Sequence, residues 1–346
     1  MRAEGSHMTG GARLAWICGG LLVILSVVVL GSLLVGAAPV APATVFELIT
    51  GRGPGQGTER TVVLAIRLPR IAAAVLAGAA LAVAGAGFQG LTRNPLADPS
   101  ILGVSGGAAF GVVLGQVSGL GQGIVEALGL TALGFAGALV AGVAVYLIAS
   151  SAGGLPVHTL LLAGVIVGIF FSAAITVLIS IVDTNRLGGV IYWLLGSVAP
   201  IPPAALGVFA LATAAGLWLV LGQARALNLL ALGDEGALEL GVDAQRVKRR
   251  VFAGAALLTG TVVAFVGPIG FVGLVVPQAL RMLLGPDNRV LVPAALLAGG
   301  AFLLVADTLA RTVVAPAELS VGVLTSFCGA PVFIWLLRSR AGRTSP

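Results

Sequence analysis

The chain has very little charge. Charged residues make up only 9% of its 346 residues, and the mean hydropathy is +1.10. Soluble domains carry about 25% charged residues, because their surfaces must interact with water. Helices that face lipid have no such need. The composition therefore excludes an ordinary soluble domain and predicts an all-α protein that crosses the membrane many times.

Cysteine and histidine are also scarce. The two cysteines, Cys18 and Cys328, lie in apolar runs at opposite ends of the chain, so we expect small buried hydrophobic residues rather than a disulfide or a metal site. Residues 1–8 contain Gly-Ser-His-Met and are interpreted as the remnant of an expression tag. His158 is then the one native histidine, which excludes a multi-histidine metal or di-heme site within one subunit.

Lysine is almost absent. The single lysine, Lys248, is followed by Arg249, so the Lys-Ser/Thr pair that a phosphate-binding P-loop needs is missing. Any ATP must be hydrolysed by another chain, and we expect no enzymatic activity and no bound cofactor here. The net charge of +6 is not arranged as a basic stripe with interleaved aromatics, so we expect no nucleic acid partner.

Long apolar runs are abundant, and each is long enough to span a membrane, which takes roughly 20 residues. The runs lie at about 14–38, 68–91, 101–118, 124–149, 157–182, 203–223, 250–272, 290–315 and 319–337, with a shorter one at 273–284. We therefore favour ten spans. Most basic residues fall on the predicted cytoplasmic side if both termini are cytoplasmic. Gly/Pro segments at Asn94–Pro99 and Gly267–Gly270 predict broken helices around a pathway.

The longest polar stretch between spans covers residues 224–249. Two short helical pieces are predicted, at Asn228–Leu232 and Glu235–Leu240, with glycines as breaks and Asp234 as the N-cap of the second. The second piece has an apolar side. Such an element could lie on the membrane or dock in the groove of a partner, and the residues alone favour neither.

Charges near the spans bear on the class of transporter. The acidic residues, among them Asp307 and Glu318, lie near the ends of spans, whereas a secondary carrier usually has an acid near the midplane. This argues against secondary transport, which is the rival from a different class. Arg67, Arg70 and Arg311 lie at predicted outer ends. They are interpreted in one of two ways. Their side chains extend to the membrane–water interface, or they form a basic ring that binds an acidic external partner.

Four sequence blocks resemble the FecCD family, the permeases of type II ABC importers for vitamin B12, heme and ferric siderophores. The first begins RLPRIAAAVLAGAAL and ends LADPSILGVSGGAAFG. The blocks are Arg67–Gly111, Leu232–Val242, Gly267–Arg289 and Glu318–Leu337. They occur in the family's order and spacing, and the resemblance covers about residues 60–340.

The resemblance implies an architecture like that of the vitamin B12 permease. Residues 9–346 would form one transmembrane permease domain of ten helices in a homodimer, in the bacterial inner membrane, with the pathway on the two-fold axis. Two copies of an ABC ATPase would bind ATP and Mg, and a periplasmic binding protein would deliver the substrate.

The resemblance also implies roles for individual residues. Coupling helices at about 228–242 would dock on the ATPase through Leu232, Gly233, Asp234, Glu235, Ala237, Leu240 and Gly241. The binding protein would dock on Arg67, Arg70 and Arg311. The gate and pathway would include Asn94, Pro95, Leu96, His158, Ala163, Gly164, Val167, Gly168 and Phe171.

Two positions depart from the family's pattern. Gln278 stands where the family usually has histidine, so no role of that histidine is carried over. Ser320 stands where proline is usual, and we expect a looser helix start with little effect.

The predicted mechanism is alternating access, with a large iron chelate passing from periplasm to cytoplasm along small and apolar side chains of the fifth span. Heme is the favoured substrate, because a large planar apolar molecule suits such a lining. Ferric siderophores and vitamin B12 are the alternatives. A respiratory-complex subunit and an intramembrane enzyme are further rivals, but cofactor ligands and a catalytic pair at depth are not apparent.

Overall fold

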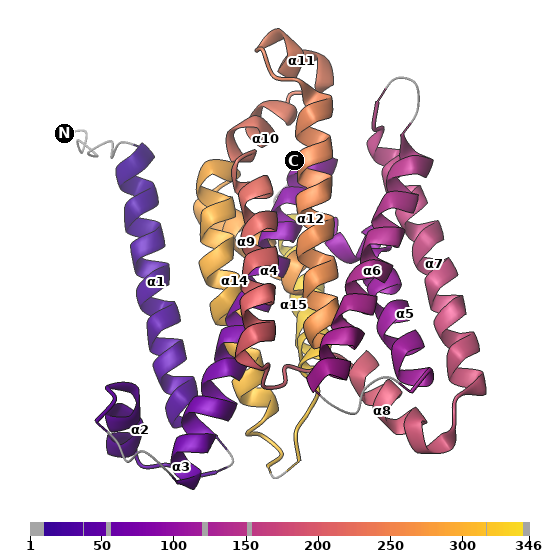
Figure 1. Cartoon of the computed structure of the whole chain (residues 1–346). Coiled ribbons are helices and arrows are strands. Elements are labelled where there is room, and N and C mark those ends of the chain that lie inside the picture. Colours follow the sequence, from indigo (N-terminus) through magenta and orange to yellow (C-terminus); the bar gives the residue numbers. More distant parts are fainter. Residues whose placement is uncertain are drawn as a thin grey trace, which may run out of the picture.

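The computed structural model describes residues 10–36, 38–52, 57–119, 124–150, 154–315 and 317–341. Residues 1–8, interpreted as a tag remnant, lie outside these ranges. The described chain is a bundle of helices (Figure 1). Its α-helices are α1 (Gly10–Leu34), α2 (Pro42–Ile49), α3 (Thr58–Arg60), α4 (Leu68–Thr92), α5 (Val104–Val117), α6 (Ile124–Ala149), α7 (Val157–Ile181), α8 (Thr184–Leu194), α9 (Pro203–Leu221), α10 (Ala224–Leu230), α11 (Asp234–Glu239), α12 (Ala244–Val266), α13 (Val272–Leu284), α14 (Asn288–Ala310) and α15 (Val321–Ala341). A π-helix, η1 (Thr61–Arg67), precedes α4, and a 3₁₀-helix, η2 (Pro99–Leu102), precedes α5.

The membrane-spanning helices match the ten predicted runs. Within the described residues, seven helical segments are long and apolar enough to cross a membrane. Three shorter apolar helices, Val104–Val117, Val272–Leu284 and Val321–Ile334, correspond to the remaining runs. The all-α, polytopic prediction is confirmed. Both predicted breaks are also present, because α4 ends before Asn94 and α12 ends at Val266, before Gly267.

Helix α4 forms the centre of the bundle. Every residue from Ala77 to Thr92 is buried, and α4 packs against α9, α12, α13 and α14. Small residues let these helices approach closely. A methyl group on Gly85 would lie 1.8 Å from the carbonyl oxygen of Gly273 on α13, so the two backbones are in direct contact there.

The two ends of the bundle carry different short helices. Helices α10 and α11 lie together at one end, here named the α11 end, and α1 begins at the same end (Figure 1). Helices α2, α3 and α8 lie at the opposite end, named the α8 end. The predicted orientation places the α11 end in the cytoplasm.

The structure differs from the sequence-based expectations in several places, among them α10, which spans Ala224–Leu230 rather than the predicted Asn228–Leu232. The helix predicted to start near residue 68 is continuous from Thr58 through η1 into α4. Pro69 has no amide hydrogen to donate, and the π-helical turns before it accommodate this loss. Helices α2 and α8 were not predicted. The cysteines are not buried within the chain, since Cys328 is exposed and Cys18 half-exposed.

Candidate functional site

Arg67 lies inside the helix rather than at its outer start. Its side chain is buried, and its guanidinium group donates hydrogen bonds of 2.5 Å to the backbone carbonyls of Leu33 and Ala38. Leu33 lies in the last turn of α1 and Ala38 follows the helix, where backbone acceptors lack helical partners. Arg67 thus holds the end of α1 against the start of α4.

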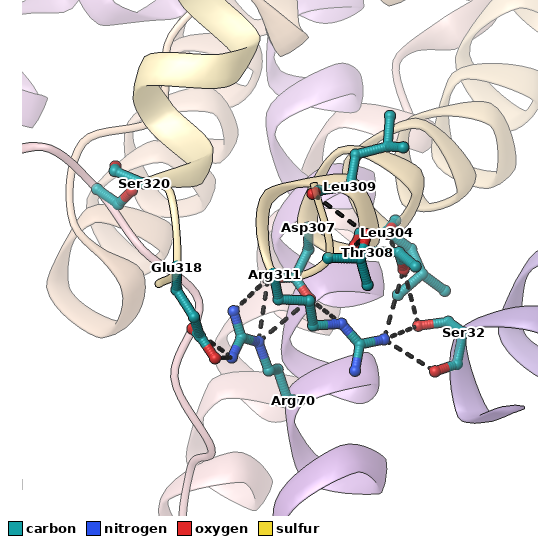
Figure 2. Close-up of polar contacts among 11 residues, drawn as sticks. Ser32, Arg70, Leu304, Asp307, Thr308, Leu309, Arg311, Glu318 and Ser320 are labelled. Carbon is teal, nitrogen blue, oxygen red and sulfur yellow. Dashed lines mark hydrogen bonds and ion pairs between the residues drawn. The ribbon is translucent and has the colours of Figure 1, made fainter. Parts of the chain in front are cut away.

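Arg70 is the centre of a buried charge cluster at the α8 end (Figure 2). It donates to both carboxylate oxygens of Asp307, at 3.0–3.2 Å, and to Glu318, at 2.9 and 3.2 Å. Arg311 lies 3.7 Å from Asp307 and donates to the backbone and hydroxyl oxygens of Ser32, at 2.8 and 2.5 Å. The cluster therefore connects α1, α4, α14 and the segment before α15.

These contacts change the interpretation of the three arginines. Arg67, Arg70 and Arg311 are each no more than 7% exposed and bind oxygens of their own chain, so in this structure they do not form an open basic ring. Sequence reasoning missed the cluster, although Asp307 and Glu318 were singled out as acids near span ends. Docking of an external partner on these arginines stays a prediction.

Ser320, just before α15, forms side-chain hydrogen bonds to another segment of the chain. Its hydroxyl lies 2.6 Å from the carbonyl oxygen of Leu195 and is also within hydrogen-bond distance of that of Gly196. These residues follow α8, so Ser320 holds the start of α15 to the end of α8. The expectation that serine in place of proline gives a looser helix start stays a prediction.

At the α11 end, the structure divides the predicted coupling residues into two sets. Gly233, with φ of +104°, and Gly241, with φ of +78°, separate α11 from its neighbours, as predicted. Leu232, Glu235 and Leu240 are exposed, and so is Leu238, at 68%. Ala237 is fully buried. Helix α11 therefore turns a small side chain toward the bundle and presents leucines and a carboxylate to its surroundings.

Asp234 is partly exposed, and its carboxylate forms two ion pairs. Its carboxylate lies 3.3 Å from the Arg93 guanidinium group, at the end of α4, and binds the Lys248 ammonium group of α12. The Lys248 side chain is only 3% exposed. Gly233, rather than Asp234, is the N-cap, which corrects the prediction. The carboxylate is instead the junction between α11, α4 and α12.

Helix α10 is fixed to the start of α14 by a polar cluster. Asn228 donates to Asp287 at 2.6 Å and accepts from the backbone and side-chain nitrogens of Asn288. Asp287 caps α14 and binds Arg289 in a bidentate ion pair. Hydrogen bonds from Arg289 lower the pKa of Asp287 to about 2, so this carboxylate is charged at neutral pH.

The loop after α4 has defined turn geometry. Arg93 adopts the left-handed conformation, with φ of +53°, and ends the helix. The Asn94 side chain accepts from the amide of Leu96 at 2.9 Å, and Asp98 caps η2 through the amide of Ser100 at 2.8 Å. Pro95 lies within this turn. The predicted gate residues therefore directly follow the arginine that binds Asp234.

The predicted pathway face of α7 packs against its own chain. Ala163, Gly164, Val167 and Phe171 are buried, and Gly168 is half-buried. The rings of Phe171 and Phe110 on α5 are 5.5 Å apart. The geometry does not support direct substrate contact by these side chains in this conformation, because α5 and η2 cover them.

The start of α7 is connected to α12. His158 is exposed in the first turn of α7. Just before it, the amide of Leu155 donates to the Gln245 side chain of α12 at 2.7 Å. Both predicted gate segments, Asn94–Leu96 and the start of α7, are therefore tied to the region around α11 and α12.

Gln278 lies in α13 with its side chain buried, and its side-chain amide oxygen has no hydrogen-bond partner among the described residues.

Gly103–Gly107 has the Gly-x-Ser-x-Gly spacing of a hydrolase nucleophile turn, which needs a preceding strand. Here the segment follows η2 and begins α5. Among the described residues, no group of three or more His, Cys, Asp and Glu side chains is arranged to hold a metal.

The fold and the different structures of the α8 and α11 ends define a polytopic helical membrane protein with interrupted spans. The model of the FecCD transport family matches residues 23–339, and the chain belongs to this family. Its members are permease subunits that work with an ATPase and a substrate-binding protein in ABC importers.

Individual relatives carry different substrate names. The chain is 42% identical over 339 residues to the hemin transport system permease protein HmuU of Yersinia pestis, covering 97% of this chain and 100% of the relative. It is 44% identical over 291 residues to the cobalamin import system permease protein BtuC of Halobacterium salinarum, covering 83% and 76%. A solved inward-facing metal-chelate type ABC transporter is 31% identical, with a TM-score of 0.80 and coverage of 94% and 99%.

Proposed function

We propose that this protein is the permease subunit of an importer for a large iron chelate, with heme as the leading substrate. The observation that carries the substrate is the match to the hemin permease, which extends over that relative's whole length. Cobalamin is the second candidate, because the cobalamin permease is 44% identical. The importer would be a homodimer of this chain with two ATPase copies and a periplasmic binding protein.

The exposed face of α11 is proposed to dock on the ATPase. Leu232, Leu238 and Leu240 are more than half exposed at the end of the bundle, where a partner's groove would bury them. Burying a leucine contributes about 1.5–3 kcal/mol. Glu235, on the same exposed surface, adds a charge that selects the partner and its orientation.

Asp234 is proposed to transmit movement of α11 to the gates. Its ion pair with Arg93 leads to the Asn94–Leu96 turn, and its pair with Lys248 leads to α12. Gln245, one turn before Lys248, binds the segment that starts α7. Movement of α11 on ATP binding would thereby reach both gate segments and exchange access from the α8 end to the α11 end.

External docking is proposed to compete with Glu318. This side chain is 43% exposed and binds Arg70, whose other contacts go to the fully buried Asp307. A carboxylate of the binding protein could replace Glu318 on the accessible side of Arg70 without disturbing Asp307.

Two kinds of substitution at α11 are expected to have different effects. Leu238→Asp places a charge in the proposed interface and should reduce ATPase binding in pull-down and light-scattering measurements. Asp234→Asn leaves that surface intact. It should preserve ATPase binding and ATP hydrolysis but lower uptake per ATP by about 5–150-fold, the range of coupling free energies of 1–3 kcal/mol.

The controls separate coupling from folding. Arg246→Gln removes an ion pair at the same end of the bundle, and the Arg246 side chain is 77% exposed. This variant should change neither ATPase binding nor uptake per ATP. The double variant Asp234→Asn/Lys248→Met leaves no unpaired buried ammonium group. If this folded double variant transports at the wild-type rate per ATP, Asp234 does not couple α11 to the gates.

The proposed function is tested by uptake into proteoliposomes that contain this chain with its ATPase and binding protein. We expect ATP-dependent uptake of heme that exceeds uptake of a ferric siderophore or cobalamin, with a Walker A variant of the ATPase as control. Preferential ATP-dependent uptake of cobalamin would overturn only the choice of heme. Uptake that proceeds equally without ATP would overturn the importer proposal itself.

A further inference from the structure

An apolar groove runs between α6 and α12, away from the coupling and charge clusters. The two helices lie side by side (Figure 1). Small residues line its floor, including Ala138, Gly142 and Ala256, and larger side chains such as Leu139 form its walls. The helices touch near its deep end, since a methyl group on Gly260 would lie 2.6 Å from the Ala138 side chain.

The groove has one polar end and the depth of one membrane leaflet. Tyr146 and Arg249 line the end nearer α11, whereas Phe135 and Gly260 line the other. Eleven residue steps separate these positions along each helix, which is about 16 Å at 1.5 Å per residue. Half of a hydrocarbon core is about 15 Å thick. The groove therefore extends from the interface to about the middle of the bilayer.

The cation at the polar end is available to a ligand. Lys248, the preceding residue, turns inward to Asp234, and Arg246 pairs with Asp243. Arg249 is exposed, and within the described chain no carboxylate forms an ion pair with it. A cation at this depth, above an apolar groove and beside a tyrosine, matches the headgroup region of a phospholipid.

We propose that this groove binds one anionic phospholipid, with an acyl chain along α6 and α12 and its phosphate at Arg249. The groove's length suits one acyl chain, and its charge suits an anionic headgroup. Arg249 at the end of the groove favours an anionic headgroup over an apolar helix of a second copy. The bound lipid would hold α12 in its position beside α6. It would thereby also fix Lys248, which lies on α12.

The test uses the full chain, purified and delipidated in mild detergent. Short-chain phosphatidylglycerol is added, and the apparent Tm is followed at one scan rate. A ligand that binds only the folded state raises Tm as its concentration rises. We expect phosphatidylglycerol to raise Tm of the wild type clearly more than phosphatidylcholine or inorganic phosphate, and Arg249→Gln to lose about half or more of this shift.

Groove-filling variants test the acyl chain independently of the charge. Ala253→Leu and Gly142→Leu fill the groove from α12 and from α6, and each should reduce the phosphatidylglycerol shift and the phospholipid retained after purification. Arg246→Gln is the matched control and should keep both. The proposal would be overturned if phosphatidylcholine stabilised the wild type equally, or if both filled variants kept an unchanged Tm shift with phosphatidylglycerol. It would also be overturned if Arg246→Gln and Arg249→Gln lost equal parts of that shift. Conversion of a dimer to a monomer by either filled variant would show a protein interface instead and would also overturn it.

Discussion

Asp307→Asn is expected to lower the free energy of unfolding by about 3–5 kcal/mol, the cost of breaking a buried ion pair by removing one partner. Asp307 is fully buried and binds Arg70 and Arg311, which are only 7% and 5% exposed. An amide would leave Arg311 without a carboxylate partner, and Arg70 with only Glu318. Unfolding in mixed micelles titrated with SDS would measure the loss.

Glu318→Gln is the matched control, because it removes the other carboxylate from the same arginine. Its side chain is 43% exposed, so water can replace much of the interaction, and we expect a loss of about 0–1 kcal/mol. Equal losses in the Asp307 and Glu318 variants would contradict the assignment of Asp307 as the main carboxylate of the cluster.

Gly85→Ala is expected to separate α4 from α13. The added methyl group would meet a backbone carbonyl at 1.8 Å, and no side-chain rotation can relieve that contact. Overpacking costs about 1–3 kcal/mol even where side chains can rearrange, so we expect a loss at the upper end of this range. Because α4 leads into the Asn94–Leu96 turn, uptake should fall with stability.

The same substitution at Gly207 provides a control of opposite sign. Gly207 lies in α9 with no atom within 4 Å of an added methyl group. Alanine is favoured over glycine within a helix by roughly 0.5–1 kcal/mol, so Gly207→Ala should stabilise the protein slightly. A loss of stability at Gly207 as large as that at Gly85 would show that close helix contact is not the cause.

Much of the fold followed from the sequence, because each span must contain its own apolar run. The breaks at Asn94–Pro99 and Gly267–Gly270 were predictable as well, since proline and glycine act locally. Helices α2 and α8 were not predicted. They have only 8 and 11 residues, too few for a span.

The candidate site was less predictable, because its partners are distant in sequence. Arg70 and Asp307 are separated by 237 positions, and a charge near a span end gives no sign of which opposite charge it will meet. The face of α7 presents a related difficulty, because small residues suit both a pathway and a close helix contact, and here they pack against α5 and η2. The apolar side predicted for the region of α11 is divided in the structure, because Leu232, Leu238 and Leu240 are exposed whereas Ala237 is buried.

The burial of Lys248 makes this protein an unusual target for chemical labelling. It carries the chain's one side-chain amine, and that amine is bound to Asp234 inside the bundle. An amine-reactive reagent applied at the α11 end therefore finds no accessible lysine while α11 remains in place. Any movement that separates Asp234 from Lys248 would expose a single modifiable position, so the protein contains its own reporter of the step in which α11 is displaced.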